Sequence, residues 1–293
     1  MGVGSQIRSI KLLSKKCLTL GITSRLQSVN YASYITINRV KVNGFSIGMQ
    51  MAGGPNRHVT IKNSTIQNNY NQGFLGSAPD LLFENNLLDY NAQSGGGGTH
   101  SIYIGSDGAF TESRLIIRGN TILHSGSYPS GGNCTSTIFN AHAYATDMII
   151  ENNTVISTTN TSGCYGMSID ASTGQAEAIN HSRLIIRGNK IVLAGTASGV
   201  GLGCVSCPNA IIENNIVVQL GGSSGFTAIA IPSNGNPNIG RGDALDTAAT
   251  IRNNSIYIGT TNSTTAIGIW MNYSTSTAET VASNVIVFGA GTS

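Results

Sequence analysis

The chain of 293 residues is long enough for one large domain or two ordinary ones. Charged residues make up only 10% of it, whereas Gly accounts for 37 residues, a balance typical of a β-rich protein with many turns. With 16 Lys and Arg, 13 Asp and Glu and a formal net charge of +3, the composition gives no basic stripe for phosphate backbones, so we expect no nucleic-acid partner. A mildly basic surface still tolerates an anionic sugar polymer.

The N-terminal segment, residues 1–21, has basic residues but no continuous apolar stretch followed by a small-residue cleavage site. It is therefore a poor secretory signal. We expect a cap or a poorly ordered segment here, in which a short helix around Ile7 to Leu20 is conceivable. No apolar run in the chain approaches the roughly 18 residues that a membrane span needs, so no membrane span is expected.

One octapeptide pattern recurs along the rest of the chain, and internal repeats of this length indicate a solenoid. It reads ITINRVKV from Ile35, VTIKNSTI from Val59, LLFENNLL from Leu81, LIIRGNTI from Leu115, MIIENNTV from Met148, LIIRGNKI from Leu184, AIIENNIV from Ala210 and ATIRNNSI from Ala249, with a degenerate ninth copy from Val281. Successive starts lie 24, 22, 34, 33, 36, 26 and 39 residues apart. The constant motif and variable spacing predict loops of different length inserted into a fixed cross-section.

Each copy places apolar residues on both sides of a polar step, which predicts a strand, a sharp bend and a second strand. The first bend position is Asn or Gly, the residues that tolerate positive φ: Asn63, Asn85, Gly119, Asn152, Gly188, Asn214 and Asn253. The next position is an asparagine in seven copies: Asn86, Asn120, Asn153, Asn189, Asn215, Asn254 and Asn284. Stacked coils would bring these side chains about 4.8 Å apart, in a ladder of amide hydrogen bonds.

A third strand follows in most coils, where apolar residues alternate with Gly, Ser or Ala. Examples are SIGMQM from Ser46, SIYIG from Ser101, GMSID from Gly166 and AIGIWM from Ala266. Three short strands per coil, each pairing in parallel with the next coil, predict an all-β fold. We therefore expect residues 22–293 to form a single domain, a right-handed parallel β-helix solenoid of about nine coils with an Asn ladder.

The I-I-x-x-N-x-I repeats, the Asn ladder and the THSIYIG strand at Thr99 to Gly105 resemble the right-handed parallel β-helix superfamily. That superfamily contains pectate lyases, related polysaccharide lyases and epimerases, and phage tailspike depolymerases. The resemblance covers about Ile22 to Phe288 and implies a polysaccharide partner and an extracellular or virion-associated location. Because the matching residues are structural, it transfers no catalytic residues.

Functional residues must then be inferred from geometry. On the strand SIYIG, inward-pointing Ile102 and Ile104 would leave Ser101, Tyr103 and Gly105 facing outward. Aligning Cys134 with Cys164 in adjacent coils then predicts two outward columns, one of Gly105, Asn140 and Asp170 and one of Tyr103, Ile138 and Ser168.

Inserted loops, outward polar residues and titratable groups coincide in coils three to five, which places the candidate site there. The catalytic candidates are His100, Tyr103, His142 and Asp170, and the substrate-binding candidates are Asp107, Asn140, Tyr144, Ser168 and Trp270.

A lyase acting on a uronic acid must neutralise the carboxylate, remove the proton on C5 and protonate the leaving oxygen. His100, Tyr103 or His142 could supply the base. A glycosidase would need two carboxylates about 5 to 9 Å apart. For these, the neighbourhood offers Asp107, Glu112, Asp147 and Asp170. No cofactor is certain and no metal ligands are assigned, although Asp107 and Asp170 could hold Ca²⁺ through oxygen atoms.

Each candidate also has a structural interpretation. His100 could pack at a strand entrance, Asp170 could cap a loop, and Asp147 is more typical of a turn residue. Tyr103 could serve only as an aromatic platform, and Trp270 could stack on a sugar or lie in a subunit contact. One repeat position alternates in charge, which predicts a stacked charge ladder: Glu84, Arg118, Glu151, Arg187 and Glu213.

The cysteines suggest little chemistry. Cys134 and Cys164 could bridge neighbouring coils if the protein is exported, and Cys204 and Cys207 form a lone CxxC. A zinc site would need two further ligands, which no second motif provides.

The sequence thus favours a carbohydrate-active β-helix protein that cleaves an acidic polysaccharide by lyase-type β-elimination. The alternatives are a non-catalytic glycan-binding adhesin or tailspike-like protein, and a glycoside hydrolase on the same fold. Solenoid ends need capping, and neither end shows an amphipathic cap. A homotrimer or additional sequence could supply it.

Overall fold

The structure, a computed structural model, describes residues 33–51, 56–94, 98–105, 112–125, 137–141, 145–160, 165–169, 183–195, 199–204, 207, 209–221, 225–231, 249–259, 266–271 and 280–289. The predicted N-terminal segment and its helix lie outside these residues. In the described part of the chain, no helix has the length and apolar character needed to cross a membrane.

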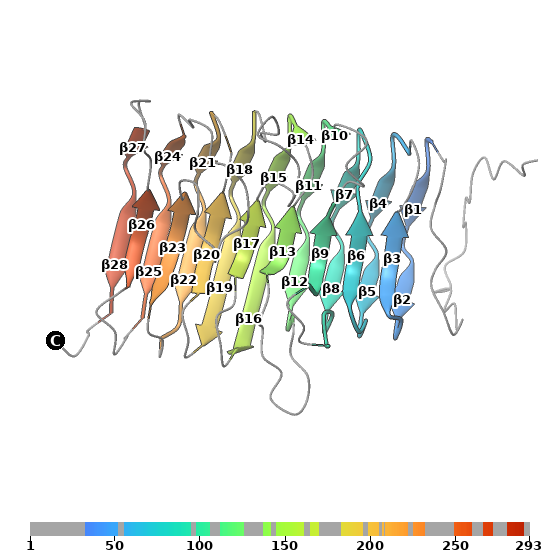
Figure 1. Cartoon of the computed structure of the whole chain (residues 1–293), viewed down its shortest axis with the longest axis horizontal. Coiled ribbons are helices and arrows are strands. Elements are labelled where there is room, and N and C mark those ends of the chain that lie inside the picture. The colour runs from blue at the N-terminus through green and yellow to red at the C-terminus, as the bar shows by residue number, and fades with distance from the viewer. Residues whose placement is uncertain are drawn as a thin grey trace, which may run out of the picture.

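Three parallel sheets run side by side along the molecule (Figure 1). Sheet 1 contains, in spatial order, β1 (Thr36–Asn38), β4 (Thr60–Lys62), β7 (Leu82–Glu84), β11 (Ile116–Arg118), β15 (Ile149–Glu151), β18 (Ile185–Arg187), β21 (Ile211–Glu213), β24 (Thr250–Arg252) and β27 (Thr280–Ala282). Sheet 2 contains β2 (Lys41–Asn43), β5 (Thr65–Gln67), β8 (Leu87–Asp89), β12 (Thr121–Leu123), β16 (Thr154–Asn160), β19 (Lys190–Gly195), β22 (Ile216–Gln219), β25 (Ser255–Ile258) and β28 (Val285–Phe288).

Sheet 3 contains β3 (Ile47–Met51), β6 (Gln72–Gly76), β9 (His100–Ile104), β13 (Thr137–Ala141), β17 (Tyr165–Ile169), β20 (Gly199–Cys204), β23 (Phe226–Ile231) and β26 (Ile267–Met271). A short extra pair joins β10 (Glu112–Ser113) to β14 (Ala145–Thr146). Each coil adds one strand to a sheet, as when Ile116 lies between Leu82 and Ile149. The all-β parallel β-helix of about nine coils is confirmed, and a right-handed coil follows the handedness rule for parallel crossovers.

The bend between sheets 1 and 2 has the predicted left-handed backbone. The φ angle is +52° at Asn63, +55° at Asn152 and +64° at Gly119. A Cβ on Gly119 would overlap the side-chain oxygen of Asn85 in the preceding coil. A larger residue than glycine at this position would therefore force the side chain of Asn85 to move.

The predicted Asn ladder is confirmed just after this bend. Asn153 Nδ2 donates to Asn189 Oδ1 at 3.0 Å and to the backbone oxygen of Ile117 at 2.9 Å. Asn153 Oδ1 in turn accepts from the backbone N and Nδ2 of Asn120, at 3.0 and 2.9 Å. Because these side chains are buried, the amides satisfy polar backbone groups that water cannot reach.

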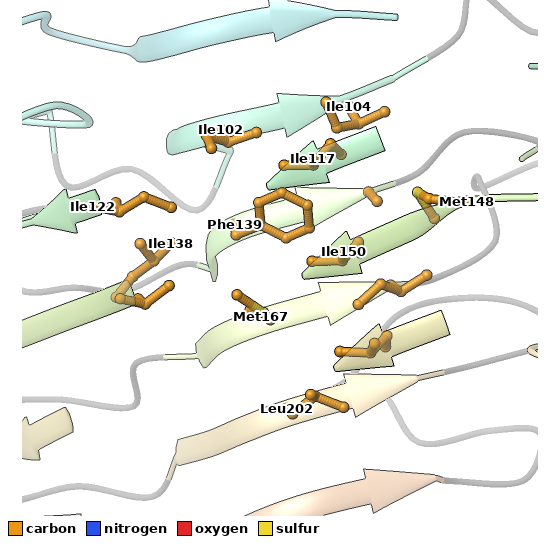
Figure 2. Close-up of a cluster of buried hydrophobic side chains, with 14 of the residues drawn as sticks. Ile102, Ile104, Ile117, Ile122, Ile138, Phe139, Met148, Ile150, Met167 and Leu202 are labelled. Carbon is orange, nitrogen blue, oxygen red and sulfur yellow. The ribbon is translucent and has the colours of Figure 1, made fainter. Parts of the chain in front are cut away.

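Inward-facing aliphatic side chains from all three sheets fill the interior (Figure 2). Ile102, Ile117 and Ile122, from sheets 3, 1 and 2, are each 0% exposed. Repeating the same inward positions in successive coils gives a continuous column of Ile, Leu, Val, Met and Phe. This column provides the hydrophobic stabilisation of the solenoid.

The last coil leaves its core positions open. Val281 and Ile286 pair with the buried Ile251 and Ile256, yet they are 49% and 40% exposed. In the first coil, by contrast, Val42 is only 2% exposed. The need for a cap and the homotrimer stay predictions.

We predict that Asn153→Ala destabilises the solenoid by about 3 kcal/mol, because it removes four buried hydrogen bonds to Asn120, Ile117 and Asn189 and leaves the backbone N of Asn120 without its acceptor. Urea unfolding measures the change. Asn43→Ala is the control, since Asn43 is exposed and its side chain accepts hydrogen bonds only from the half-buried Gln67 and the exposed Asn68. Equal losses for the two variants would contradict a special role for the ladder.

Gln219 is a polar exception in the core. It lies in register with Leu193 and Ile258, is 2% exposed, and within the described part of the chain neither side-chain polar atom has a hydrogen-bond partner. We expect Gln219→Leu to stabilise the protein by about 1–3 kcal/mol, because a desolvated amide is replaced by an apolar group of similar size. The unfolding free energy tests this, and a destabilised variant would show that the amide has a necessary partner.

Candidate functional site

The outer face of sheet 3 carries a straight row of side chains, called the outer row here. Its members are register partners on successive strands: Gln50, Leu75, Tyr103, Asn140, Ser168, Gly203, Ala230 and Trp270. Successive positions are about 4.8 Å apart along the solenoid axis. Four of the predicted site residues, Tyr103, Asn140, Ser168 and Trp270, are thereby brought into one line.

The register differs from the predicted columns. Asn140 lies beside Tyr103 and Ser168, not beside Gly105, so the alignment of Cys134 with Cys164 was wrong by two residues. A two-residue slip keeps a side chain on the same face of a strand, which is why Asn140 was still assigned to the outer face.

Ser101 and Ile138 were also predicted to face outward, and this was wrong. They are 0% and 1% exposed, and Ser101 Oγ hydrogen-bonds Ser125 Oγ at 2.8 Å. Here the chain is just turning out of sheet 2 into sheet 3. On the next strand, a Cβ placed on Gly166 would lie 2.6 Å from a side-chain carbon of Ile191 in sheet 2. Simple alternation therefore fails at this end of the strand.

His100 lies directly beside Tyr103, on the same strand. Their rings stack with centroids 5.1 Å apart and planes 23° apart. The backbone N of His100 donates to Gln72 Oε1 at 2.8 Å, and Gln72 Nε2 donates to the backbone oxygen of Gly98 at 2.7 Å. His100 is 4% exposed, as its structural interpretation at a strand entrance predicts. It is therefore placed to support the Tyr103 ring.

Asn140 and Ser168 continue the outer row on the next two strands. They are 4% and 3% exposed, whereas Tyr103 is half-buried. An amide and a hydroxyl group thus lie in one line with the Tyr103 phenol.

Trp270 ends the outer row within an aromatic and aliphatic cluster. It packs with Tyr165 against the buried Val200 and Ala230. Burial raises the pKa of the Tyr165 phenol. Sequence reasoning missed Tyr165, although it precedes Ser168 by three residues on one strand, as His100 precedes Tyr103.

Four of the predicted site residues lie outside the described part of the chain: Asp107, His142, Tyr144 and Asp170. Cys134 and Cys164 lie outside it as well. His142 and Asp170 directly follow β13 and β17 in the sequence. Their roles remain predictions, including the suggested Ca²⁺ ligands. In the described part, no group of three His, Cys, Asp or Glu side chains is arranged to hold a metal.

The described acidic groups near the site have structural partners. Asp147 has φ of +58° and pairs with Arg183, whose Nη2 lies 2.6 Å from Asp147 Oδ2. That hydrogen bond lowers the pKa of Asp147. Asp80 pairs in the same way with Arg114, which lowers the pKa of Asp80. Asp147 is thus a turn residue, as expected, and it is held in its charged form.

The predicted charge ladder on sheet 1 is also confirmed. Arg118 Nε lies 2.7 Å from Glu84, Arg187 Nη2 lies 2.7 Å from Glu151, and the pattern continues between Arg252 and Glu213. Each of these ion pairs joins two neighbouring coils, so the carboxylates have a structural role.

Two further Tyr–His pairs were missed. Tyr34 stacks on His58, and Tyr90 stacks on His124, with centroids 4.5 and 4.6 Å apart. Asp89 binds Nδ1 of His124 at 2.9 Å. Each described histidine therefore stacks on a tyrosine, although the two rings come from different coils in these two pairs, so local sequence spacing gives no signal.

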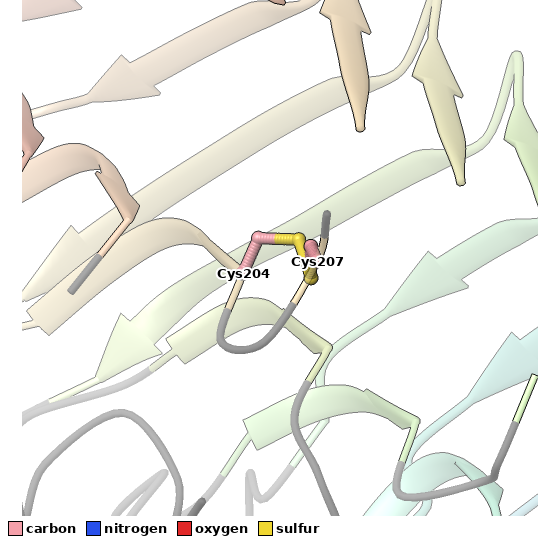
Figure 3. Close-up of a disulfide and its surroundings, with 2 residues drawn as sticks. All are labelled: Cys204 and Cys207. Atoms are coloured by element: carbon pink, nitrogen blue, oxygen red, sulfur yellow. A yellow bond between two sulfur atoms is a disulfide. The ribbon is translucent and has the colours of Figure 1, made fainter. Parts of the chain in front are cut away.

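Cys204 and Cys207 form a disulfide at the end of β20 (Figure 3). Both residues are 0% exposed. The CxxC motif is thus a buried crosslink in this structure, a state that the sequence left open.

No protein-family model matches the chain. No curated protein matches it either. Among solved structures, it is similar to the A-module of mannuronan C-5 epimerase AlgE6 from Azotobacter vinelandii, with 12% identity and a TM-score of 0.48 over 87% of this chain and 74% of that one. Similarity at this level does not determine an activity.

We predict that Gln72→Met destabilises the fold by about 1–3 kcal/mol, since it removes the partners of a buried backbone N and of a backbone oxygen next to His100. Urea unfolding gives the loss, and near-ultraviolet circular dichroism reports the loosened His100–Tyr103 stack. Gln67→Met is the control, because Gln67 donates only to the exposed Asn43. An unchanged spectrum would show that Gln72 does not position these rings.

Proposed function

We propose that the chain binds an acidic polysaccharide along the outer row and cleaves it by β-elimination at Tyr103. The observation that carries the proposal is the row itself, a line of aromatic, amide and hydroxyl side chains parallel to the solenoid axis. From Tyr103 to Trp270 the row crosses five strand spacings, about 24 Å, which suits an extended polymer of several sugars.

Tyr103 is the proposed catalytic residue. In the reaction, a base removes the C5 proton, the electron pair forms a C4–C5 double bond, and the bond from C4 to the glycosidic oxygen breaks. The leaving oxygen then takes a proton, which the Tyr103 phenol donates. His100, stacked and buried beside it, is a positioning residue. His142, which follows β13 in the sequence, stays the candidate base.

Trp270 is proposed to form the opposite end of the binding surface, and Tyr165, on the strand of Ser168, belongs to the same apolar cluster. An indole at the edge of an apolar cluster offers a sugar ring a face for stacking, and the half-buried Tyr103 offers a second contact, with the more buried Asn140 and Ser168 in the row between them. The proposed location is extracellular or virion-associated, and the Cys204–Cys207 disulfide supports an oxidising environment.

A specific observation favours a second candidate, a surface that only binds glycans. Among the described residues of the outer row there is no cation that could neutralise a uronate carboxylate, which β-elimination requires. If the residues outside the described part supply none, the row is a binding surface of an adhesin or tailspike-like protein.

The test is incubation of the purified chain with a panel of uronic-acid polymers, with and without Ca²⁺, while the absorbance of the unsaturated product and the release of reducing ends are followed. We expect Tyr103→Phe to lower the rate of absorbance increase at least about 100-fold with polymer binding retained. Trp270→Ala should weaken binding about tenfold, because it removes a stacking surface.

Tyr257→Phe is the control, because Tyr257 is exposed on sheet 2 and should affect neither quantity. Reducing ends without absorbance would indicate hydrolysis. Binding that depends on Trp270 without any product would establish the binding-only function, and absence of both would refute the proposal.

A further inference from the structure

Charge is distributed very unevenly along this chain. The first acidic residue is Asp80, so residues 1–79 contain nine of the 16 Lys and Arg and none of the 13 Asp and Glu. Their formal charge is +9, while residues 80–293 carry −6, and together they give the net +3 of the chain. The small net charge therefore conceals a strongly basic N-terminal quarter.

The described basic residues of this quarter lie in the first two coils, at the β1 end in Figure 1. We call Arg39, Lys41, Arg57 and Lys62 the basic end. Arg39 occupies the bend between β1 and β2, and its backbone N donates to the backbone oxygen of Lys62 at 3.2 Å. Lys41 begins β2, so three of the four cations meet at the corner between sheets 1 and 2. Arg57 lies just before β4, at the other edge of sheet 1.

The basic end differs from the rest of the solenoid in how its charges are paired. Every described arginine after Asp80 forms an ion pair with a carboxylate: Arg114, Arg118, Arg183, Arg187 and Arg252. Among the described residues, none of the four cations of the basic end forms such an ion pair, although Lys62 lies in register with Glu84 and Arg57 acts on Asp80 through its charge. Arg39, Lys41 and Arg57 are also exposed. Like charges at this density repel one another, and a bound anion would relieve that repulsion.

Neutral hydrogen-bonding groups lie among these cations. Asn63 Nδ2 donates to Asn38 Oδ1 at 2.9 Å, and Asn43 Oδ1 accepts from Gln67 and Asn68 at 2.9 and 2.7 Å. Exposed amides beside cations can bind both the hydroxyl and the carboxylate groups of an acidic sugar.

We propose that the basic end is a second polysaccharide-binding surface, which docks an anionic polymer electrostatically on a different side of the solenoid from the outer row. This inference takes from the proposed function only the class of ligand, an acidic polysaccharide. It assigns the docking step to Arg39, Lys41, Arg57 and Lys62, whereas Tyr103 and Trp270 act on the chain once it reaches sheet 3.

A polymer of low charge density fits this surface better than a nucleic acid. Duplex DNA carries one negative charge for about every 1.7 Å of its length, and a duplex lying along the solenoid would meet the −6 charge of residues 80–293. A polyuronate carries one carboxylate per sugar. The polyuronate is therefore attracted to the basic end and is repelled less by the negative charge of residues 80–293.

The experiment measures binding of the full chain to immobilised polygalacturonate over a series of salt concentrations. The triple variant Arg39→Gln, Lys41→Gln and Lys62→Gln is expected to bind at least about tenfold more weakly at low salt and to show a shallower dependence on salt. Its unfolding temperature should be unchanged or raised, because repulsion has been removed; a large fall would indicate misfolding, and single substitutions would then be compared instead.

Lys190→Gln is the matched control. Lys190 is an exposed lysine on the outer side of sheet 2, at the first position of β19 as Lys41 is of β2, but it lies far from the basic end. Its binding should match that of the unsubstituted chain. Unchanged binding by the triple variant, or an equal loss with Lys190→Gln, would overturn the proposal.

The outcomes separate this inference from the proposed function. Tyr103→Phe should leave the salt dependence intact, so docking can be established even if no cleavage is found. Conversely, cleavage that persists unchanged in the triple variant at low salt would refute docking and leave the proposed function standing. Duplex DNA is run in the same assay, and binding as tight as that of polygalacturonate would overturn the assignment to a polysaccharide.

Discussion

The stacked pairing of successive coils, fixed by the buried Asn ladder, is the constraint on which the rest of the structure depends. Each ladder amide donates through its nitrogen to the next coil and accepts through its oxygen from the preceding coil, as Asn153 does with Asn189 and Asn120. A coil must therefore place its bend at the same point as its neighbours. This requirement explains why Asn or Gly recurs at the bend, and why extra residues are inserted elsewhere in the coil.

The same stacking determines what the outer faces can do. Residues at equivalent positions fall into rows, so charge or aromatic character is repeated or alternated along the axis. On sheet 1 the alternation of Arg and Glu neutralises a row from Glu84 to Arg252. On sheet 2 there is no such alternation at Lys41, whose register partner is the neutral Thr65. The cross-section of a solenoid is constant, so its coils differ mainly in their outward side chains. A binding surface can therefore arise where the charges of a row do not neutralise one another.

The sequence predicted the features that repeat and failed where the repeat is interrupted. The octapeptide carries both its strands and its ladder residue at fixed spacing, so Asn120 and Asn153 could be aligned by inspection. The strands of sheet 3 follow inserts of different length, and the cysteine alignment was therefore displaced by two residues. Ser101 and Ile138 were misplaced because a turn from sheet 2 interrupts the alternation. Tyr–His stacks between coils, such as Tyr90 on His124, depend on that register and gave no local signal.

Burial of the outer row has a consequence for chemistry. Asn140 and Ser168 face away from the core, yet they are 4% and 3% exposed, so their polar groups lie in a more buried environment than the half-buried ring of Tyr103. Hydrogen bonds and charges act more strongly in such an environment than on an open surface. The basic end is exposed and attracts ligands over a longer range. A long polymer could therefore be captured by weak, salt-sensitive contacts at the basic end and be oriented by short, directional contacts at the outer row. An elongated solenoid can keep these two surfaces apart.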